Sequence, residues 1–97
     1  MLTCTLEQGR VILEGELKVS SLGSLMDCLE QALSFEPALE LDLAQVTTVD
    51  AAGLQLLLAF LESRQVIGPA SLKNAPPVFH KALELAGMRD HFNFYLD

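Results

Sequence analysis

The sequence has few cysteines, and their placement excludes the common cysteine-based sites. Cys4 and Cys28 are the only two, and they lie far apart in the chain. A structural zinc site requires closely spaced ligand pairs such as CxxC with further cysteines or histidines, and small disulfide-rich domains contain more cysteines than this. We therefore expect two reduced, buried thiols, with no metal and no cofactor.

The sequence also lacks a hydrophobic run of membrane-spanning length, although 51% of its 97 residues are hydrophobic. A spanning helix requires about 20 consecutive apolar residues. The longest candidate, residues 54–61, is far shorter and is expected to be a buried helix. Charges are scattered through residues 1–20, so the basic start and apolar stretch of a signal peptide are missing. We expect no membrane insertion and a cytoplasmic location.

Basic residues are scarce, and no catalytic signature is present. The six Lys and Arg residues are spread along a chain of net charge −7, so the basic patch typical of nucleic-acid binding is missing. Partners are expected to be proteins with neutral or basic surfaces. Glycine-rich phosphate loops, GxSxG and HExxH are absent, and neither His80 nor His91 has a serine or cysteine placed nearby as a nucleophile. We expect no enzymatic activity.

The hydrophobic pattern predicts a single domain over residues 1–97. Alternating residues predict strands at 2–6 and 11–17, joined by a turn at Gln8-Gly9. Apolar residues at helical spacing then predict a helix that begins at Ser20 or Ser21 and ends before Pro37. Its apolar face comprises Leu22, Leu25, Met26, Leu29 and Leu33.

The second half of the chain continues this alternation of strands and helices. We expect a strand at 38–43, further β-prone residues at 46–49, a helix at about 51–65, a strand at 70–73 and a helix that begins at Pro76-Pro77 and ends at Gly87. Residues 92–96 either form an edge strand or cover the core. This order predicts an α/β fold, a single mixed sheet of four to five strands with three to four helices packed on one face and the other face in water.

The helix at 51–65 has apolar residues on two sides. At about 100° per residue, the side expected to face the sheet comprises Leu54, Leu57, Leu58 and Leu61. The opposite side comprises Ala52, Leu56, Ala59 and Ser63, with Phe60 at its margin, where a solvent-facing helix normally carries charges. Neighbouring helices could cover this stripe. Alternatively, Ala52, Leu56 and Phe60 form a docking surface for a protein partner or for a second copy of the chain.

The most informative motif is Val49-Asp50-Ala51-Ala52-Gly53-Leu54, a strand-to-helix turn in which Asp50 is the natural cap. The unsatisfied amides of a helix N-terminus can hold an anion or face a partner. The motif resembles the V/I-D-S/T-S/A/G-G-L turn of the STAS family, which includes the anti-sigma factor antagonists. Gly15-Glu16-Leu17 resembles that family's G-E-L strand end, and Leu85-Ala86-Gly87-Met88 followed by Phe92 resembles its closing pattern.

The resemblance implies a non-enzymatic protein-interaction module of bacterial signalling and transcription regulation. The turn, together with the apolar stripe on the helix that follows, gives the expected partner-binding residues: Thr48, Asp50, Ala51, Ala52, Gly53, Leu56 and Phe60. In similar antagonists, a serine or threonine between the Asp and the Gly is phosphorylated by the partner kinase, which adds negative charge and blocks binding. Ala51 and Ala52 occupy those positions, so we expect no such switch. Thr47 and Thr48 are expected to be ordinary strand residues.

Three functions remain open at this point. The first is a regulator that binds an anti-sigma factor with serine-kinase activity or a sensor kinase of a chemotaxis or two-component system. The second is an accessory subunit that binds the ATPase of a lipid-transporting ABC system, because a short STAS protein serves that role. The third is nucleotide binding, for which the chain offers no lysine-bearing phosphate loop.

Overall fold

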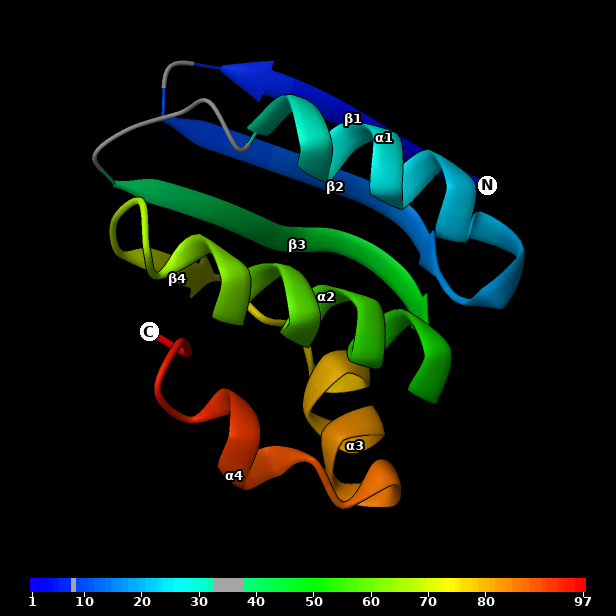
Figure 1. Ribbon diagram of the computed structural model, residues 1–97. Coiled ribbons are helices and arrows are strands. Elements are labelled where there is room, and N and C mark those ends of the chain that lie inside the picture. Colours follow the sequence, from blue (N-terminus) through cyan, green and yellow to red (C-terminus); the bar gives the residue numbers. More distant parts are fainter. Residues whose placement is uncertain (8, 33–37) are drawn as a thin grey trace.

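The fold is built on one four-stranded sheet in the order β1-β2-β3-β4. The computed structural model describes residues 1–7, 9–32 and 38–97. The strands are β1 (Leu2–Glu7), β2 (Arg10–Leu17), β3 (Leu39–Val49) and β4 (Ala70–Lys73). β1 pairs with β2 in antiparallel orientation, whereas β3 runs parallel to both β2 and β4. The sheet is therefore mixed, as predicted, and β3 lies at its centre (Figure 1).

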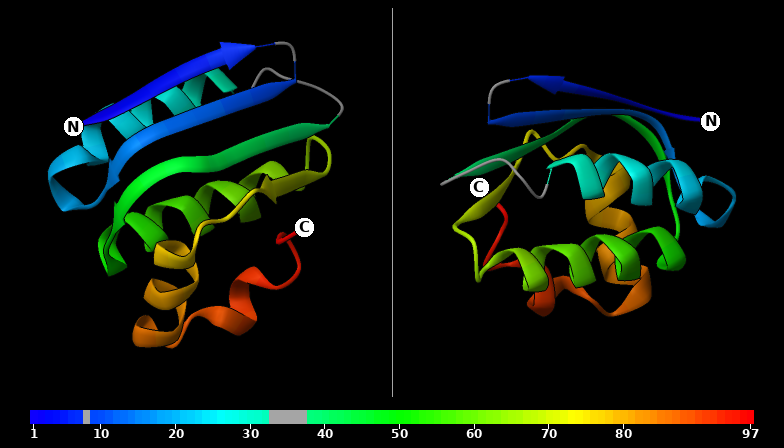
Figure 2. Two further views of the ribbon diagram at one scale, coloured as in Figure 1. Left: turned by 180° about the vertical axis from the view of Figure 1, so that it is seen from behind. Right: turned by 45° about the horizontal axis from the view of Figure 1, so that its top comes forward.

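The helices lie on one side of the sheet. A 3₁₀ turn, η1 (Val19–Ser21), leads into α1 (Leu22–Ala32), and α2 (Ala51–Arg64), α3 (Pro77–Ala86) and α4 (Arg89–Phe92) follow. In both views of Figure 2, α1 and α2 lie on the same side of the strands, and the left-hand view shows α3 and α4 following below β4. The predicted fold class is confirmed. The predicted end of the first helix before Pro37 lies outside the described residues.

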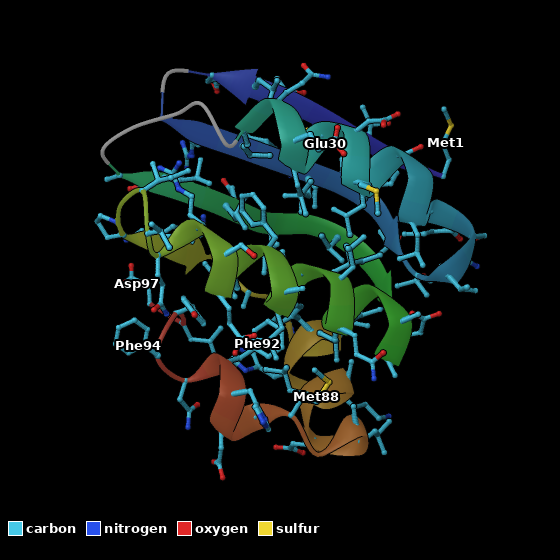
Figure 3. The ribbon with its side chains drawn as sticks, in the orientation of Figure 1. Met1, Glu30, Met88, Phe92, Phe94 and Asp97 are labelled. Carbon is cyan, nitrogen blue, oxygen red and sulfur yellow. A yellow bond between two sulfur atoms is a disulfide. The ribbon has the colours of Figure 1, made fainter. Side chains whose placement is uncertain are left out.

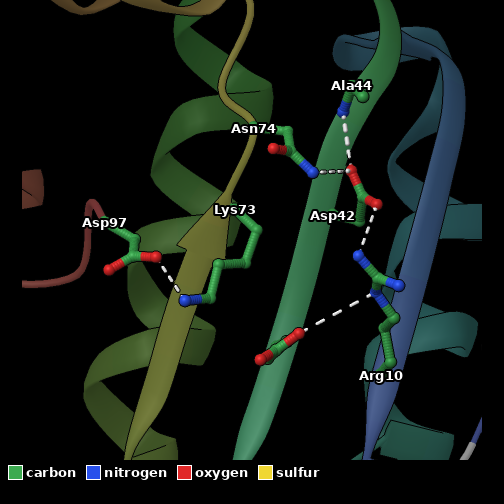
Figure 4. A network of polar contacts seen from close by, with 7 residues as sticks. Arg10, Asp42, Ala44, Lys73, Asn74 and Asp97 are labelled. Carbon is green, nitrogen blue, oxygen red and sulfur yellow. Dashed lines mark hydrogen bonds and ion pairs between the residues drawn. The ribbon is translucent and has the colours of Figure 1, made fainter.

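Strand alternation divides the sheet into an apolar and a polar face. Leu39, Leu41 and Leu43 of β3 are at most 1% exposed and face the helices. On the other face, Arg10 donates to Asp42 at 3.0 Å, Asn74 donates to Asp42, and Lys73 pairs with Asp97 (Figure 4). One side of the sheet therefore meets water, as the alternation in β3 predicts.

Two details of the predicted elements need correction. The segments predicted at 38–43 and 46–49 form one continuous strand, β3, whose register against β2 shifts at two points because β3 carries an extra residue at each of them. Met26 does not belong to the buried face of α1, because its side chain is 48% exposed, whereas Cys28 and Ala32 are buried.

The C-terminal segment mainly covers the core. Phe92 in α4 is fully buried and packs edge-on against Phe79 of α3. Instead of a full strand, this segment forms an isolated bridge to β4 between Leu72 and Leu96, with hydrogen bonds from the Leu72 amide to the Tyr95 carbonyl and from the Asp97 amide to the Leu72 carbonyl. Gly87 ends α3 with a φ of 68°, the left-handed conformation that glycine adopts at low cost.

The expectation of two reduced thiols is wrong in the structure, where Cys4 of β1 and Cys28 of α1 form a disulfide. The Cα atoms are 6.2 Å apart, within the ordinary range for a disulfide. Cys4 points to the helical side of the sheet, and Cys28 lies on the buried face of α1. The bond therefore fastens α1 to an edge strand.

Candidate protein-binding site

Asp50 joins three segments of the chain at one end of the sheet. Its Oδ1 accepts a hydrogen bond from the Gly53 amide at 2.9 Å, which caps α2 as predicted. Its Oδ2 accepts from the Val19 amide at 3.0 Å, and its own amide donates to the Leu17 carbonyl at 3.1 Å. Two of the three motifs that carry the family resemblance, Gly15-Glu16-Leu17 and the turn at Asp50, therefore meet in one joint.

Gly53 is required at this joint because the first turn of α2 lies directly on the end of β2. A Cβ atom at position 53 would lie 2.3 Å from the Leu17 carbonyl oxygen and 2.7 Å from the carbonyl carbon. Real Cβ atoms do not approach backbone atoms so closely. The absence of a side chain at Gly53 thus allows the first turn of α2 to contact the end of β2. The D-x-x-G spacing follows because the cap residue Asp50 accepts its hydrogen bond from the amide three residues later.

The charge on Asp50 is stabilised by the backbone around it. The hydrogen bond from the Gly53 amide lowers the pKa of the carboxyl below its ordinary value, with a smaller contribution from the Val19 amide and an opposing contribution from burial. A helix N-terminus also favours a negative charge. Asp50 is therefore expected to remain ionised through the whole neutral range.

The stability contributed by Asp50 should disappear in acid. Because the folded-state pKa is depressed, the contribution is fully present above the unfolded-state pKa of about 3.9 and is lost as the pH falls through the lower folded-state value. Asn keeps one acceptor oxygen for the Gly53 amide but sets an amide NH₂ against the Val19 amide, so Asp50→Asn should be less stable than the wild type at pH 7 by about 1 kcal/mol for the lost hydrogen bond. The difference should shrink below about pH 4. Urea denaturation across this range measures it. A stability difference that stayed constant with pH would show that the charge on Asp50 contributes nothing to the free energy of unfolding.

The residues between Asp50 and Gly53 face outward. Ala51 is exposed and Ala52 is half-buried, so neither helps to fill the core. Of the two threonines that precede them, Thr47 donates to the Gly15 carbonyl at 3.2 Å, and both side chains are exposed at the end of β3. Of the two positions at which the resemblance predicts a hydroxyl, Ala51 is therefore the accessible one, and both carry only a methyl group.

An apolar cleft of about 240 Å³ lies between the N-terminus of α2 and α3. Leu85 is 81% exposed at its edge. The residues that line the cleft are Val49, Asp50, Ala51, Ala82, Leu85 and Ala86. We call it the α2–α3 cleft. Its position brings the predicted turn and the closing Leu85-Ala86-Gly87 motif onto one surface.

A second apolar depression, of about 210 Å³, runs between α1 and α2. The residues that line it are Met26, Leu29, Glu30, Leu56, Ala59, Phe60 and Ser63. We call it the α1–α2 groove. Leu56 is half-buried in its wall, but Phe60 is only 8% exposed and belongs to the core, which corrects its assignment to the outer margin of the helix.

Four of the seven predicted binding residues divide between two surfaces, whereas Gly53 is buried against the end of β2 and Thr48 is exposed at the end of β3. Asp50 and Ala51 line the α2–α3 cleft, and Leu56 and Phe60 line the α1–α2 groove on the other side of the helix. Leu85 and Met26 were not predicted as site residues. Met26 was counted on the apolar face of the first helix, and Leu85 was noted only as part of the closing motif.

Neither a membrane-spanning helix nor a metal site is found in the described part of the chain. None of the helices in residues 1–7, 9–32 and 38–97 has the length and apolar character needed to cross a membrane. Within the same ranges, no three His, Cys, Asp or Glu side chains gather closely enough to hold a metal ion.

The family model STAS_2, described as "Mlab, STAS domain", matches residues 1–96. The chain belongs to the STAS_2 family. Nearly every described element of this STAS domain, from β1 to the bridge at Leu96, falls within the match. A search of curated protein sequences finds no match.

Solved structures with the same fold include anti-sigma factor antagonists. The antagonist from Mycobacterium paratuberculosis superposes with a TM-score of 0.74 at 20% identity, over 99% of this STAS domain and 83% of that chain. Unphosphorylated SpoIIAA gives a TM-score of 0.70 at 16% identity, over 100% and 86% of the two chains. Phosphorylated SpoIIAA from Bacillus gives 0.66 at 16% identity, over 100% and 89%. At these identities the similarity establishes the fold.

Proposed function

We propose that this STAS domain is a non-enzymatic module that binds a protein partner through the turn at Asp50 and the α2–α3 cleft, without a phosphorylation switch at the turn. The observation that carries the proposal is the exposed Ala51 beside an apolar cleft with Leu85 at its edge. Exposed large apolar side chains next to a concavity are typical of protein interfaces. The partner class that the anti-sigma antagonist neighbours suggest is an anti-sigma factor with kinase activity.

The family description supports a second partner class. Because the matched model is described as "Mlab, STAS domain", the ATPase subunit of a lipid-transporting ABC system is the alternative partner. The proposal assigns either partner to the same surface of this chain, the turn at Asp50 and the α2–α3 cleft. Co-purification of the untagged partner from the native host distinguishes them, since it recovers either a kinase or an ABC ATPase.

Leu85→Glu is the direct test of the α2–α3 cleft. Leu85 is 81% exposed, so the substitution should change the free energy of unfolding by less than about 0.5 kcal/mol. A charge placed at the edge of an apolar interface should weaken partner binding at least tenfold, measured by titration with the purified partner. Val66→Glu is the matched control, because Val66 is 91% exposed after the end of α2. Unchanged binding by Leu85→Glu would contradict the proposal.

Ala51 provides a separate test of the missing switch. Ala51→Glu adds a negative charge in the first turn of α2, where a helix tolerates it, so the fold should be retained. If the partner packs against this turn, the charge should weaken binding in the way that a phosphate does. Mass spectrometry after incubation of the wild type with the partner and ATP should find no phosphate at Thr47 or Thr48. A phosphorylated threonine there would contradict the switchless mechanism.

A further inference from the structure

The α1–α2 groove has an apolar floor and an acidic rim. Met26 is 48% exposed at its edge, Leu56 is half-buried in its wall, and the buried Leu29 and Phe60 form its floor. Glu30 lines the groove from α1 (Figure 3), and Asp27 lies one helical turn before it on the same surface of α1. On α2, the exposed Glu62 lies next to the groove residue Ser63 and one turn after Ala59.

No basic side chain offsets these acids on the two helices. The sequence of α1 contains no lysine or arginine, and the only one in α2 is Arg64, which is 0% exposed. The surface around the groove is therefore negative over both walls. A binding partner must bring positive charge, because complementary charges across an interface favour the correct partner and like charges exclude others.

The size of the groove favours protein side chains as its occupants. A cavity of roughly 150 Å³ is large enough to hold a benzene molecule. A groove of about 210 Å³ therefore holds one or two apolar side chains, whereas small-molecule sites usually measure about 300–1,000 Å³.

The walls of the groove favour a helical partner over an extended one. Both walls are helices, whose backbone amides and carbonyls already bond within each helix. An extended segment lying in the groove would find few backbone hydrogen-bond partners there, but a helix satisfies its own. A third helix can place apolar side chains from successive turns into the groove.

We propose that the α1–α2 groove binds an amphipathic helix of a protein partner, whose apolar side chains fill the groove while flanking lysines and arginines pair with Asp27, Glu30 and Glu62. This inference rests on the proposed function in treating the chain as a protein-binding module, but it uses a different surface. A second copy of the chain is a poor occupant. A symmetric contact would place the same acidic rims against each other.

The test uses a synthetic helical peptide of about 18 residues, with leucines at positions i, i+4, i+7 and i+11 and with lysines and arginines beside them. One control peptide has glutamate at every basic position. Another has the same composition in an order that destroys the apolar stripe. Fluorescence anisotropy at about 0.15 M salt should detect micromolar binding of the first peptide and at least tenfold weaker binding of both controls. Equal binding of the reordered peptide would show that net charge alone drives the interaction, and would overturn the proposal.

Variants of the protein test whether the peptide binds in the α1–α2 groove. Met26→Glu and Glu30→Lys should each weaken binding at least fivefold, with unchanged circular dichroism and melting temperature, since both residues are exposed. Glu14→Lys is the matched charge control, because Glu14 is exposed on β2 and alternates with the buried Leu13, which places it on the opposite face of the sheet. The affinity of the Glu14→Lys variant for the peptide should remain within twofold of the wild-type affinity.

Two further outcomes separate this inference from the proposed function. If Leu85→Glu abolishes capture of the natural partner while Met26→Glu and Glu30→Lys bind partner and peptide normally, the proposed function stands and the groove inference is wrong. Analytical ultracentrifugation completes the test, and we expect a monomer at all accessible concentrations. A dimer that Met26→Glu dissociates would assign the groove to self-association and overturn the proposal.

Discussion

Gly53→Ala should destabilise the protein by at least about 3 kcal/mol, the upper range for overpacking of a well-packed site. The added methyl group would lie 2.3 Å from the Leu17 carbonyl oxygen, a backbone atom that cannot rotate away as a side chain does. Relief requires α2 to move off the end of β2, which also breaks the hydrogen bond from Gly53 to Asp50. Chemical denaturation at pH 7 measures the loss, and the urea midpoint should fall strongly.

Gly23→Ala is the matched control for this substitution. Gly23 lies in α1, and a Cβ atom there would meet nothing within 4 Å. Alanine is the better helix former by about 1 kcal/mol, so this variant should be slightly more stable than the wild type. If both substitutions had similar effects, the close approach of Gly53 to β2 would not determine stability.

Reduction of the disulfide between Cys4 and Cys28 should lower the free energy of unfolding by about 3 kcal/mol. The bond closes a loop across a sequence separation of 24, and such a cross-link restricts the unfolded chain. The measurement is guanidinium denaturation of the wild type with and without a phosphine reductant. Mass spectrometry after alkylation under native and denaturing conditions establishes the oxidation state of each sample.

Cys4→Ser is the control for the disulfide, because Cys4 is only partly buried whereas Cys28 is 4% exposed. The variant should have the stability of the reduced wild type and should not respond to reductant. Thiols of the untreated wild type that alkylate readily in the folded protein would contradict the disulfide itself.

The disulfide is also where prediction from sequence failed for a clear physical reason. Alternation along β1 places Cys4 on the same side as Leu2 and Leu6, and helical spacing places Cys28 with Leu25 and Leu29, so each cysteine could have been assigned to the buried side. Local patterns do not encode that α1 crosses over β1 rather than over a central strand. Only the tertiary arrangement brings the two sulfur atoms together.

Local sequence patterns were sufficient to predict the features that depend on a single helix or strand. The strands, the caps at Asp50 and Gly87 and the polar face of the sheet depend on short stretches of sequence, and all were predicted. The site was predicted less completely because it lies between elements. A helical wheel could not place Phe60 in the core, since its burial depends on how closely a neighbouring helix packs.

The joint at Asp50 has a consequence for how the chain moves. The amides of Val19, Asp50 and Gly53 take part in hydrogen bonds that share one residue, so the start of α2 cannot open without releasing η1 and the end of β2. These amides should exchange hydrogen as a single cooperative unit. A surface held in this way is already ordered before any partner arrives, and little conformational entropy remains to be lost on association.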